Sequence, residues 1–283
     1  MGVVNITPDS FSDGGLFLAL DKGVAHALRM LDEGADLIDL GAESTRPGSR
    51  AGGSDALVSA EEEQARLLPV VRGILEQRPD AVISADTYKA ATARAALEAG
   101  AAIVNDVSGL TWDPELARVC AELGAGVVLA HTRGRPHEWR GQAKLEPDAL
   151  LAMVRDGLGA SLRAAEAAGI AEEATMVDPG YGFGKKFEEN YALLARQGEL
   201  LALGRPLLAG LSRKSFLGHT LAPLFGGEAA PLKEAPAEAR ETASVAAMTA
   251  AILNGASIVR VHAVRAAVEA ARIADAIVGA GLP

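Results

Sequence analysis

Charged and hydrogen-bonding side chains recur in this sequence at one kind of place, the carboxyl end of a short apolar run. One polar residue in such a place is common, but eight in succession are not expected by chance. The positions therefore predict a ligand site assembled from the ends of many strands. They are Asn5, residues 41–45, Asp86, Asn105, His131, Asp178, Lys214 and residues 260–262.

These residues divide into two chemical groups. Asp86, Asn105 and Asp178 supply carboxylate and amide groups, which suit a heterocycle with an amidine-like edge because a carboxylate accepts two N–H bonds side by side. The chain has a formal net charge of -10, so cations gathered at one rim indicate an anionic ligand, most simply a phosphate or diphosphate. The cations are Arg46, Arg213, Lys214, Arg260 and His262.

The apolar runs alternate with longer segments of helical period that are rich in Ala, Leu, Glu and Arg. Eight such units without a break predict a parallel sheet closed into a single (β/α)8 TIM barrel over residues 1–283, with a doubly wound open sheet as the alternative. The predicted strands are residues 2–5, 36–41, 81–86, 102–107, 126–131, 175–178, 206–212 and 257–262. The predicted helices are residues 21–33, 60–77, 90–98, 114–123, 147–168, 189–203, 237–254 and 264–278.

Several loops stand out in this arrangement. Residues 2–15 and 41–53 form βα loops 1 and 2, which are long and polar for a barrel and are predicted to be mobile covers over the site. Residues 220–241, rich in Gly, Pro and Ala, predict an insertion or a mobile loop after the seventh strand. The glycine-rich residues 180–185 lack the spacing of the dinucleotide fingerprint and of the P-loop, so neither is predicted.

Each candidate residue also has a structural interpretation. An Asp at a strand end can cap the next helix, which is the alternative for Asp86. Asn105 can bond the loop backbone, and His131 can be a buried structural histidine. Arg260 is harder to explain in this way, because an unpaired guanidinium in an apolar strand is costly. For Glu43 the structural interpretation is preferred, namely a salt bridge that braces the barrel rim.

Composition limits the classes of protein. The length of 283 residues fits one barrel, which needs roughly 250. Hydrophobic residues make up 49% and aromatics 4%, so the core must be built from Ala, Leu, Val and Ile. The acidic charge argues against nucleic-acid binding. The single Cys120, interpreted as a buried thiol, indicates a reducing compartment, and the absence of a visible signal peptide or long apolar run predicts a soluble cytoplasmic protein without a membrane partner.

The motifs resemble those of the dihydropteroate synthase family. Residues 1–15 and 38–48 are similar to the family's first two signatures, and the two together are highly specific. The resemblance runs in family order over nearly the whole chain. The further matches are residues 84–87, 105–109, 178–185, 212–216 and 260–262.

The resemblance implies a transferase of folate biosynthesis and a sulfonamide target. Such an enzyme condenses 6-hydroxymethyl-7,8-dihydropterin diphosphate with 4-aminobenzoate and releases diphosphate and 7,8-dihydropteroate. It also implies a homodimer and a Mg2+ ion on the diphosphate, coordinated with the help of Asn5. By the same resemblance the pterin is held by Asp86, Asn105, Asp178 and Lys214, and the anion by Arg260 and His262, with Asp86, Lys214, Arg260 and His262 as the catalytic groups. Phe11, Thr45, Arg46, Pro47, Phe183 and Ser215 would shape the loops and the aminobenzoate pocket.

The chain departs from the family pattern at a few positions. Ala42 replaces a usual glycine, residues 129–132 replace a usual Met-His-Met, and Ala263 replaces a usual aspartate. Because the chain begins within the first predicted strand, we expect a truncated start or a differently closed barrel floor. Two other functions remain as alternatives: a pterin-binding methyltransferase that passes a methyl group to a corrinoid protein, and a non-enzymatic pterin- or folate-binding protein. Residues 212–216 and 260–262 favour the synthase, because a diphosphate leaving group needs them.

Overall fold

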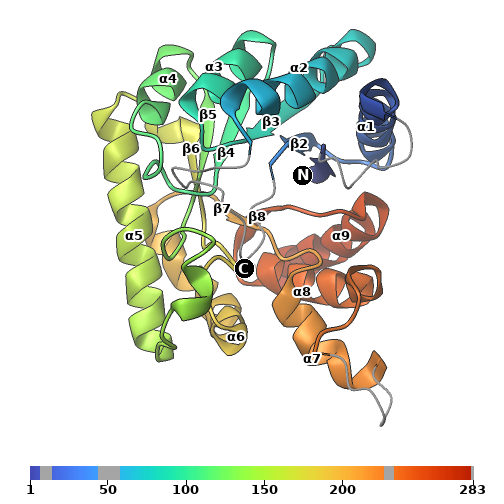
Figure 1. The fold of residues 1–283 in the computed structure, drawn as a ribbon. Helices are drawn as coiled ribbons and strands as arrows, with labels where there is room; N and C mark the ends of the chain where they lie inside the picture. The colour runs from blue at the N-terminus through green and yellow to red at the C-terminus, as the bar shows by residue number, and fades with distance from the viewer. Residues whose placement is uncertain (7–14, 44–57, 226–232, 282–283) are drawn as a thin grey trace.

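A computed structural model describes residues 1–6, 15–43, 58–225 and 233–281. Its strands form one eight-stranded parallel sheet in which each strand pairs with the next along the chain. Helices surround the sheet, as Figure 1 shows. The strands are β1 (Gly2–Asn5), β2 (Leu37–Gly41), β3 (Val82–Asp86), β4 (Ile103–Asp106), β5 (Gly126–Ala130), β6 (Thr175–Asp178), β7 (Leu207–Ala209) and β8 (Ala256–Val259).

The sheet closes on itself where the chain continues beyond β8. The Val3 N–H donates to the Val261 carbonyl at 2.9 Å, and the Val261 N–H donates to the Met1 carbonyl at 2.9 Å. Gly2 and Val261 thereby form a parallel bridge, and the Met1 amino group donates to the Val259 carbonyl at 3.0 Å. The predicted (β/α)8 barrel is therefore confirmed, and the open-sheet alternative is wrong.

The helices follow the strands in the predicted alternation, with shifts of a few residues at their ends. The segment predicted as one helix over residues 189–203 divides into an α-helix and a 3-10 segment, Gln197–Leu203. The α-helices are α1 (Gly15–Asp32), α2 (Ala60–Gln77), α3 (Ala90–Glu98), α4 (Leu116–Glu122), α5 (Pro147–Ala167), α6 (Phe187–Arg196), α7 (Ser215–Phe225), α8 (Glu241–Leu253) and α9 (Val264–Gly281).

Helix α7 was not predicted, and the interpretation of residues 220–225 as an insertion or mobile loop was wrong. Gly218 and Pro223 hide the helical pattern of this segment. The helix is held by packing, because Phe216 and Leu217 are buried in the hydrophobic cluster between β7 and its helices. Residues 226–232 of the predicted loop lie outside the described residues. The same holds for most of βα loops 1 and 2, whose predicted mobility stays a prediction.

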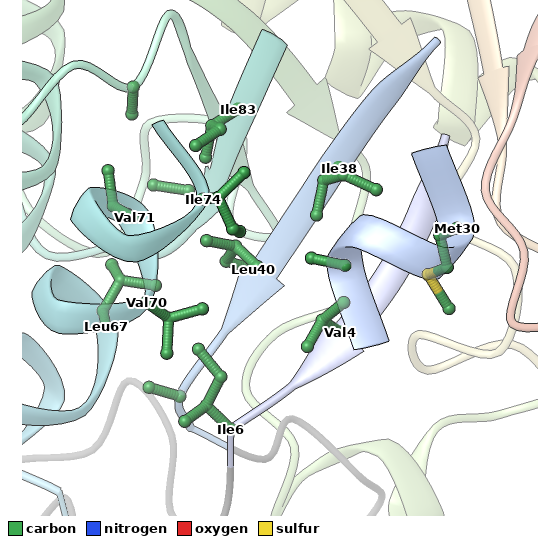
Figure 2. Close-up of a cluster of buried hydrophobic side chains, with 14 of the residues drawn as sticks. Val4, Ile6, Met30, Ile38, Leu40, Leu67, Val70, Val71, Ile74 and Ile83 are labelled. Carbon is green, nitrogen blue, oxygen red and sulfur yellow. The ribbon is translucent and has the colours of Figure 1, made fainter. Parts of the chain in front are cut away.

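Aliphatic side chains fill the space between the sheet and its helices, as the composition predicted. Figure 2 shows one such cluster, where α2 faces β2 and β3. Cys120 is buried in another cluster, as expected. In the described part of the chain, no helix is long and apolar enough to cross a membrane. The residues labelled in Figure 2 are Val4, Ile6, Met30, Ile38, Leu40, Leu67, Val70, Val71, Ile74 and Ile83.

The inside of the barrel has two layers that differ in polarity. We call the lower layer the floor cluster; its members are all apolar. Because side chains on a strand alternate between its two faces, residues two positions apart face the same side. Two residues beyond four members of the floor cluster stand Asp39, Asn105, Asp178 and Arg260, which together with Asp86 we call the polar layer. The floor cluster is Met1, Leu37, Ile103, Val128, Met176, Leu208 and Ile258.

Candidate active site

Neighbouring strands place the acids and the amide of the polar layer side by side. Asp86 and Asn105 are register partners on β3 and β4, and Gly41 of β2 pairs with Asp86 on its other side. A Cβ atom on Gly41 would lie 3.3 Å from the Asp86 carboxylate, so the glycine leaves that carboxylate its room. Asn105 is 7% exposed and Asp178 is 6% exposed, so both act from a largely dry interior.

Arg260 links two acids that lie on neighbouring strands, Asp39 of β2 and Asp86 of β3. Its Nη2 lies 2.7 Å from Asp86 Oδ2, and its Nε donates to Asp39 Oδ2 at 2.6 Å. The interior guanidinium is thus paired twice, as its cost in an apolar strand requires. The two carboxylates raise the pKa of Arg260 even though burial opposes them.

The capping interpretation of Asp86 is wrong. The residue before α3 is Lys89, which makes no side-chain cap. The N–H of Ala90 donates instead to Asp113 Oδ2 at 2.8 Å. Asp86 is consequently free to pair with Arg260. Its side chain is 22% exposed.

Asp178 is the last residue of β6 and lies near Gly210, which follows β7. Its Oδ1 accepts a hydrogen bond from the Gly180 N–H at 2.7 Å. Burial raises the pKa of Asp178, while this hydrogen bond and the nearby lysines oppose the shift. A Cβ atom on Gly210 would lie 3.8 Å from Asp178 Oδ2 and 4.0 Å from Arg260 Cδ. The acid and the cation thus both lie within van der Waals reach of this backbone position.

Lys214 completes the cationic side of the site. Its Nζ lies 3.9 Å from the centre of the Phe183 ring, within the range of a cation–π interaction. Burial lowers the pKa of Lys214 to about 8, against the opposing charges of Asp178 and Asp86. At neutral pH the ammonium group still predominates, so Lys214 can offer a positive charge to a ligand.

Two of the predicted rim cations differ from expectation. Burial, together with the charges of Arg213, Arg260 and Lys214, lowers the pKa of His262 to about 3. His262 is thus a neutral imidazole in the ligand-free site, with Nδ1 2.9 Å from Ser212 Oγ. Arg213 turns toward α8, where its Nη2 lies 3.2 Å from Glu241. The sequence shows neither the burial of His262 nor the Glu241 partner of Arg213. The predicted role of His262 in holding an anion stays a prediction.

Asp86 is the most strongly perturbed acid of the site. Burial raises its pKa to about 7. Arg260 and Lys214 act to lower this pKa, whereas Asp39 and Glu63 act to raise it. A buried acid with specific charged partners inside a barrel mouth is typical of a functional site.

The remaining predicted residues are placed at the rim or lie outside the description. Asn5 ends β1 with an exposed side chain, and Ser215 begins α7 half-buried. Glu43 accepts from Lys89 Nζ at 2.5 Å, which confirms the predicted brace at the rim. Phe11, Thr45, Arg46 and Pro47 lie outside the described residues.

His131 serves the structure of the site. Its Nδ1 lies 3.0 Å from Lys185 Nζ, and the same ammonium group donates to the carbonyls of His131 and Gly180 at 3.1 and 2.8 Å. Lys185 thus ties the loop after β6 to the end of β5. Burial lowers the pKa of Lys185 to about 7 and that of His131 well below its usual range. The structural interpretation of His131 is therefore the one these contacts favour.

Asp39 and Lys185 contact site residues but were not predicted as part of the site. Asp39 is the only charged residue in the apolar run 37–41, and the cost argument applied to Arg260 would have found it. Its carboxylate is fully buried and also accepts from Asn105 Nδ2 at 3.2 Å. Lys185 follows a glycine-rich segment that suggested only a loop, so nothing local pointed to its burial.

Comparison with known proteins agrees with this geometry. A family model described as pterin binding enzyme matches residues 1–262. The dihydropteroate synthase of Mycobacterium leprae is 44% identical over 99% of this chain and 94% of its own length. A Yersinia pestis dihydropteroate synthase solved with a sulfonamide drug superposes with a TM-score of 0.86 at 40% identity, over 99% of this chain and 94% of that one. The Xanthomonas albilineans enzyme solved with 4-aminobenzoic acid gives 0.84 at 41%, over 100% and 93%.

The family match and the acids and cations at the carboxyl ends of the strands thus place this barrel in the pterin-binding class of enzymes. The chain belongs to the dihydropteroate synthase family, whose members are transferases of folate biosynthesis. The methyltransferase and the non-enzymatic binding protein, the two alternative functions, are therefore set aside.

Proposed function

We propose that the polar layer condenses 6-hydroxymethyl-7,8-dihydropterin diphosphate with 4-aminobenzoate. The observation that carries this proposal is the joint placement of Asp86, Asn105 and Asp178 at the carboxyl ends of β3, β4 and β6, with Arg260 paired to Asp86 and lying near Gly210 beside Asp178. Xanthomonas albilineans dihydropteroate synthase has been solved with 4-aminobenzoic acid and with 7,8-dihydropteroate, which are a substrate and the product of this reaction.

The pterin lies, in this proposal, in the space beside Gly210. The Asp178 carboxylate accepts the N–H bonds of the ring edge, and Asn105 offers one donor and one acceptor. Lys214 donates from the side where it contacts Phe183. Dry surroundings strengthen each of these hydrogen bonds relative to bulk water.

Electrostatic stabilisation drives the chemical step. The amine nitrogen of 4-aminobenzoate bonds to the methylene carbon of the pterin, the carbon–oxygen bond breaks with its electron pair going to diphosphate, and the amine passes a proton to solvent water. Arg260, Lys214 and the N–H of a neutral His262 stabilise the departing negative charge, and Asp86 and Asp178 stabilise positive charge on the ring. Neither a covalent nucleophile nor a general base is needed, since positioning and charge suffice.

A Mg2+ ion fits the site only as a partner of the diphosphate. In the described segments, no group of three His, Cys, Asp or Glu side chains could hold a metal by itself. The exposed carboxamide of Asn5 offers one oxygen, and Mg2+ readily completes such a set with phosphate oxygens and waters. The bound ion would neutralise part of the charge of the leaving group.

The aminobenzoate pocket is proposed to form between Phe183 and Ser215 on one side and the two long loops on the other. Phe11, Thr45, Arg46 and Pro47 belong to those loops. If the loops complete the pocket, a sulfonamide should bind at least about tenfold more tightly when pterin, diphosphate and Mg2+ are present. Calorimetric titration with and without these ligands measures the difference, and equal affinities would show a preformed pocket.

A homodimer in the cytoplasm is the form we propose for the enzyme. Ile273 and Ile277 of α9 are 63% and 53% exposed and stand one helical turn apart. Such an apolar pair favours a protein contact. Light scattering should give twice the chain mass for the wild type and a lower mass for Ile277→Glu. The lone buried Cys120 suits a reducing compartment.

Turnover with both substrates and Mg2+ is the direct test of the proposed function. We expect 7,8-dihydropteroate and diphosphate in equal amounts. Chelation of Mg2+ should reduce the rate, and added Mg2+ should restore it. Binding of the pterin without any product would contradict the proposed activity.

A further inference from the structure

Asp39 belongs to the polar layer and contacts two of the residues that we assign to the pterin. It stands in the middle of β2 and is fully buried, with Ser84 of β3 as its register partner. Burying a carboxylate is costly unless the charge is paired. The partners of Asp39 therefore indicate what its charge does in this site.

One oxygen of Asp39 holds two residues of the site. Oδ2 accepts from Arg260 Nε at 2.6 Å and from Asn105 Nδ2 at 3.2 Å. Arg260 follows β8 and Asn105 lies in β4, and in the closed barrel these two segments approach β2 from opposite directions, by way of β1 and of β3. A charged hydrogen bond fixes the plane of a guanidinium, and the second bond fixes which way the Asn105 amide faces.

Asp39 also competes with Asp86 for the charge of Arg260. The guanidinium bridges the two carboxylates, with Nη2 2.7 Å from Asp86 Oδ2. The charged groups that act on Asp86 are Arg260, Asp39 of β2, Glu63 of α2 and Lys214 after β7. Among them, Asp39 and Glu63 raise the pKa of Asp86, and Asp39 acts more strongly than Glu63.

We propose that Asp39 is a positioning residue, which orients Arg260 and Asn105 for the pterin and shares the charge of Arg260 with Asp86. The inference rests on the proposed assignment of Arg260 and Asn105 to the pterin. Asp39 itself touches no substrate in this arrangement, because it is fully buried and its carboxylate contacts Arg260 and Asn105. Its effect therefore passes through those two side chains.

The test is Asp39→Asn in the full chain, with Ser84→Ala as the matched control. Asn preserves the size of the side chain and an acceptor oxygen for Arg260, but it removes the charge. Ser84 is buried like Asp39, and in the described structure its hydroxyl has no hydrogen-bond partner. Its loss should leave Arg260 and Asn105 in place.

Steady-state kinetics gives the first readout. We expect kcat/KM for the pterin diphosphate to fall at least about tenfold in Asp39→Asn, while KM for 4-aminobenzoate changes less than about twofold. Ser84→Ala should remain within about twofold of the wild type for both substrates. Unchanged pterin constants in Asp39→Asn, or equal losses for the two substrates, would overturn the positioning role.

A titration of the ligand-free protein gives a readout that does not depend on turnover. Carboxyl carbon resonances of labelled aspartate would be followed against pH, with Asp86 assigned by its loss in Asp86→Asn. We expect the midpoint of Asp86 to move to lower pH in Asp39→Asn, since Arg260 then pairs with Asp86 alone. An unchanged midpoint overturns the shared charge.

The two readouts separate failure of this inference from failure of the proposed function. A wild type without turnover contradicts the proposed function, whereas the titration still decides the role of Asp39. If Asp39→Asn does not fold, Asp39→Ser, which is smaller and also uncharged, enters the same titration. A midpoint that shifts in Asp39→Ser and not in Ser84→Ala supports the inference.

Discussion

The floor cluster and the polar layer come from the same strands, two residues apart, and they meet opposite demands. Ile103 belongs to the floor and Asn105 to the layer above, and Ile258 and Arg260 repeat the pattern on β8. The floor cluster removes apolar surface from water, which stabilises the fold by about 25 cal/mol per Å2. The polar layer buries charge, and the raised pKa values of Asp86 and Asp178 and the lowered pKa of neighbouring Lys214 show the cost.

The difference teaches that one barrel interior can separate stability from chemistry by a single step of strand alternation. A change in the floor cluster should affect folding and spare the reaction. A change in the polar layer should affect the reaction first. In some cases it should also stabilise the fold, because it removes a buried charge. The following predictions test this separation, from the largest expected effect to the smallest.

The largest effect is expected for Arg260→Ala. Removing the guanidinium leaves the fully buried Asp39 and the partly exposed Asp86 without their shared cation, and loss of one partner of a buried ion pair typically costs about 3–5 kcal/mol. We expect kcat/KM to fall by at least about 100-fold, measured by steady-state kinetics. Arg260→Lys should recover part of the loss. Near-normal kinetics in Arg260→Ala would place Arg260 outside the reaction.

The floor cluster offers the matching experiment, Leu208→Ala. Leu208 is fully buried, and loss of its side chain should lower the free energy of unfolding by about 2–5 kcal/mol, because a cavity remains. Urea denaturation measures this change. The kinetic constants of the folded variant should stay within about twofold of the wild type at 25 °C. A selective loss of pterin affinity would show that floor and polar layer are coupled.

Asp178→Asn should separate binding from folding within the polar layer. The exchange keeps the size of the side chain but replaces an acceptor oxygen by a donor. We expect pterin affinity to fall at least about tenfold by calorimetry, with the free energy of unfolding within about 1 kcal/mol of the wild type. If the variant binds the pterin normally but unfolds easily, Asp178 is structural.

The smallest effect is expected in the pH dependence of stability. The pKa of Asp86 rises from its ordinary 3.8 to about 7 on folding, so between these values the folded chain binds a proton that the unfolded chain has lost. Stability from this group is therefore present at low pH and is lost as pH rises through about 7. The wild type should lose Tm when the pH is raised from about 5 to about 8, and Asp86→Asn should make this loss of Tm smaller. An unchanged loss of Tm would show that other titrating groups cause it. Leu208→Ala, which changes no charge, is the control.

The sequence predicted the barrel well because its signals are local. The Val- and Ile-rich runs and the glycines after the helices fix each element within a few residues of its observed bounds. The helix α7 escaped prediction because Pro223 and Gly218 weaken its local pattern, while the packing of Phe216 holds it in the fold. Propensity is a weak guide wherever tertiary packing supplies the stability.

The candidate site was predictable in position and less so in chemistry. Asp86, Asn105 and Asp178 were found because strand ends are marked in the sequence by a change from apolar to polar residues. The charge state of His262 was not, since its low pKa comes from burial and from nearby cations that include Arg213 and Lys214 of another segment. Asp39 was missed because a single charge in a strand looks like an exception until its partner is known.

The sequence by itself determined which residues stand at the carboxyl ends of the strands, through the alternation of apolar runs and helical segments. Only the tertiary structure decided which charges meet. Arg260 and Asp39 are 221 residues apart in the chain and 2.6 Å apart in the barrel. Their contact exists because the chain after β8 closes against β1, and the low-polarity interior then makes such a pairing stronger than it would be in water.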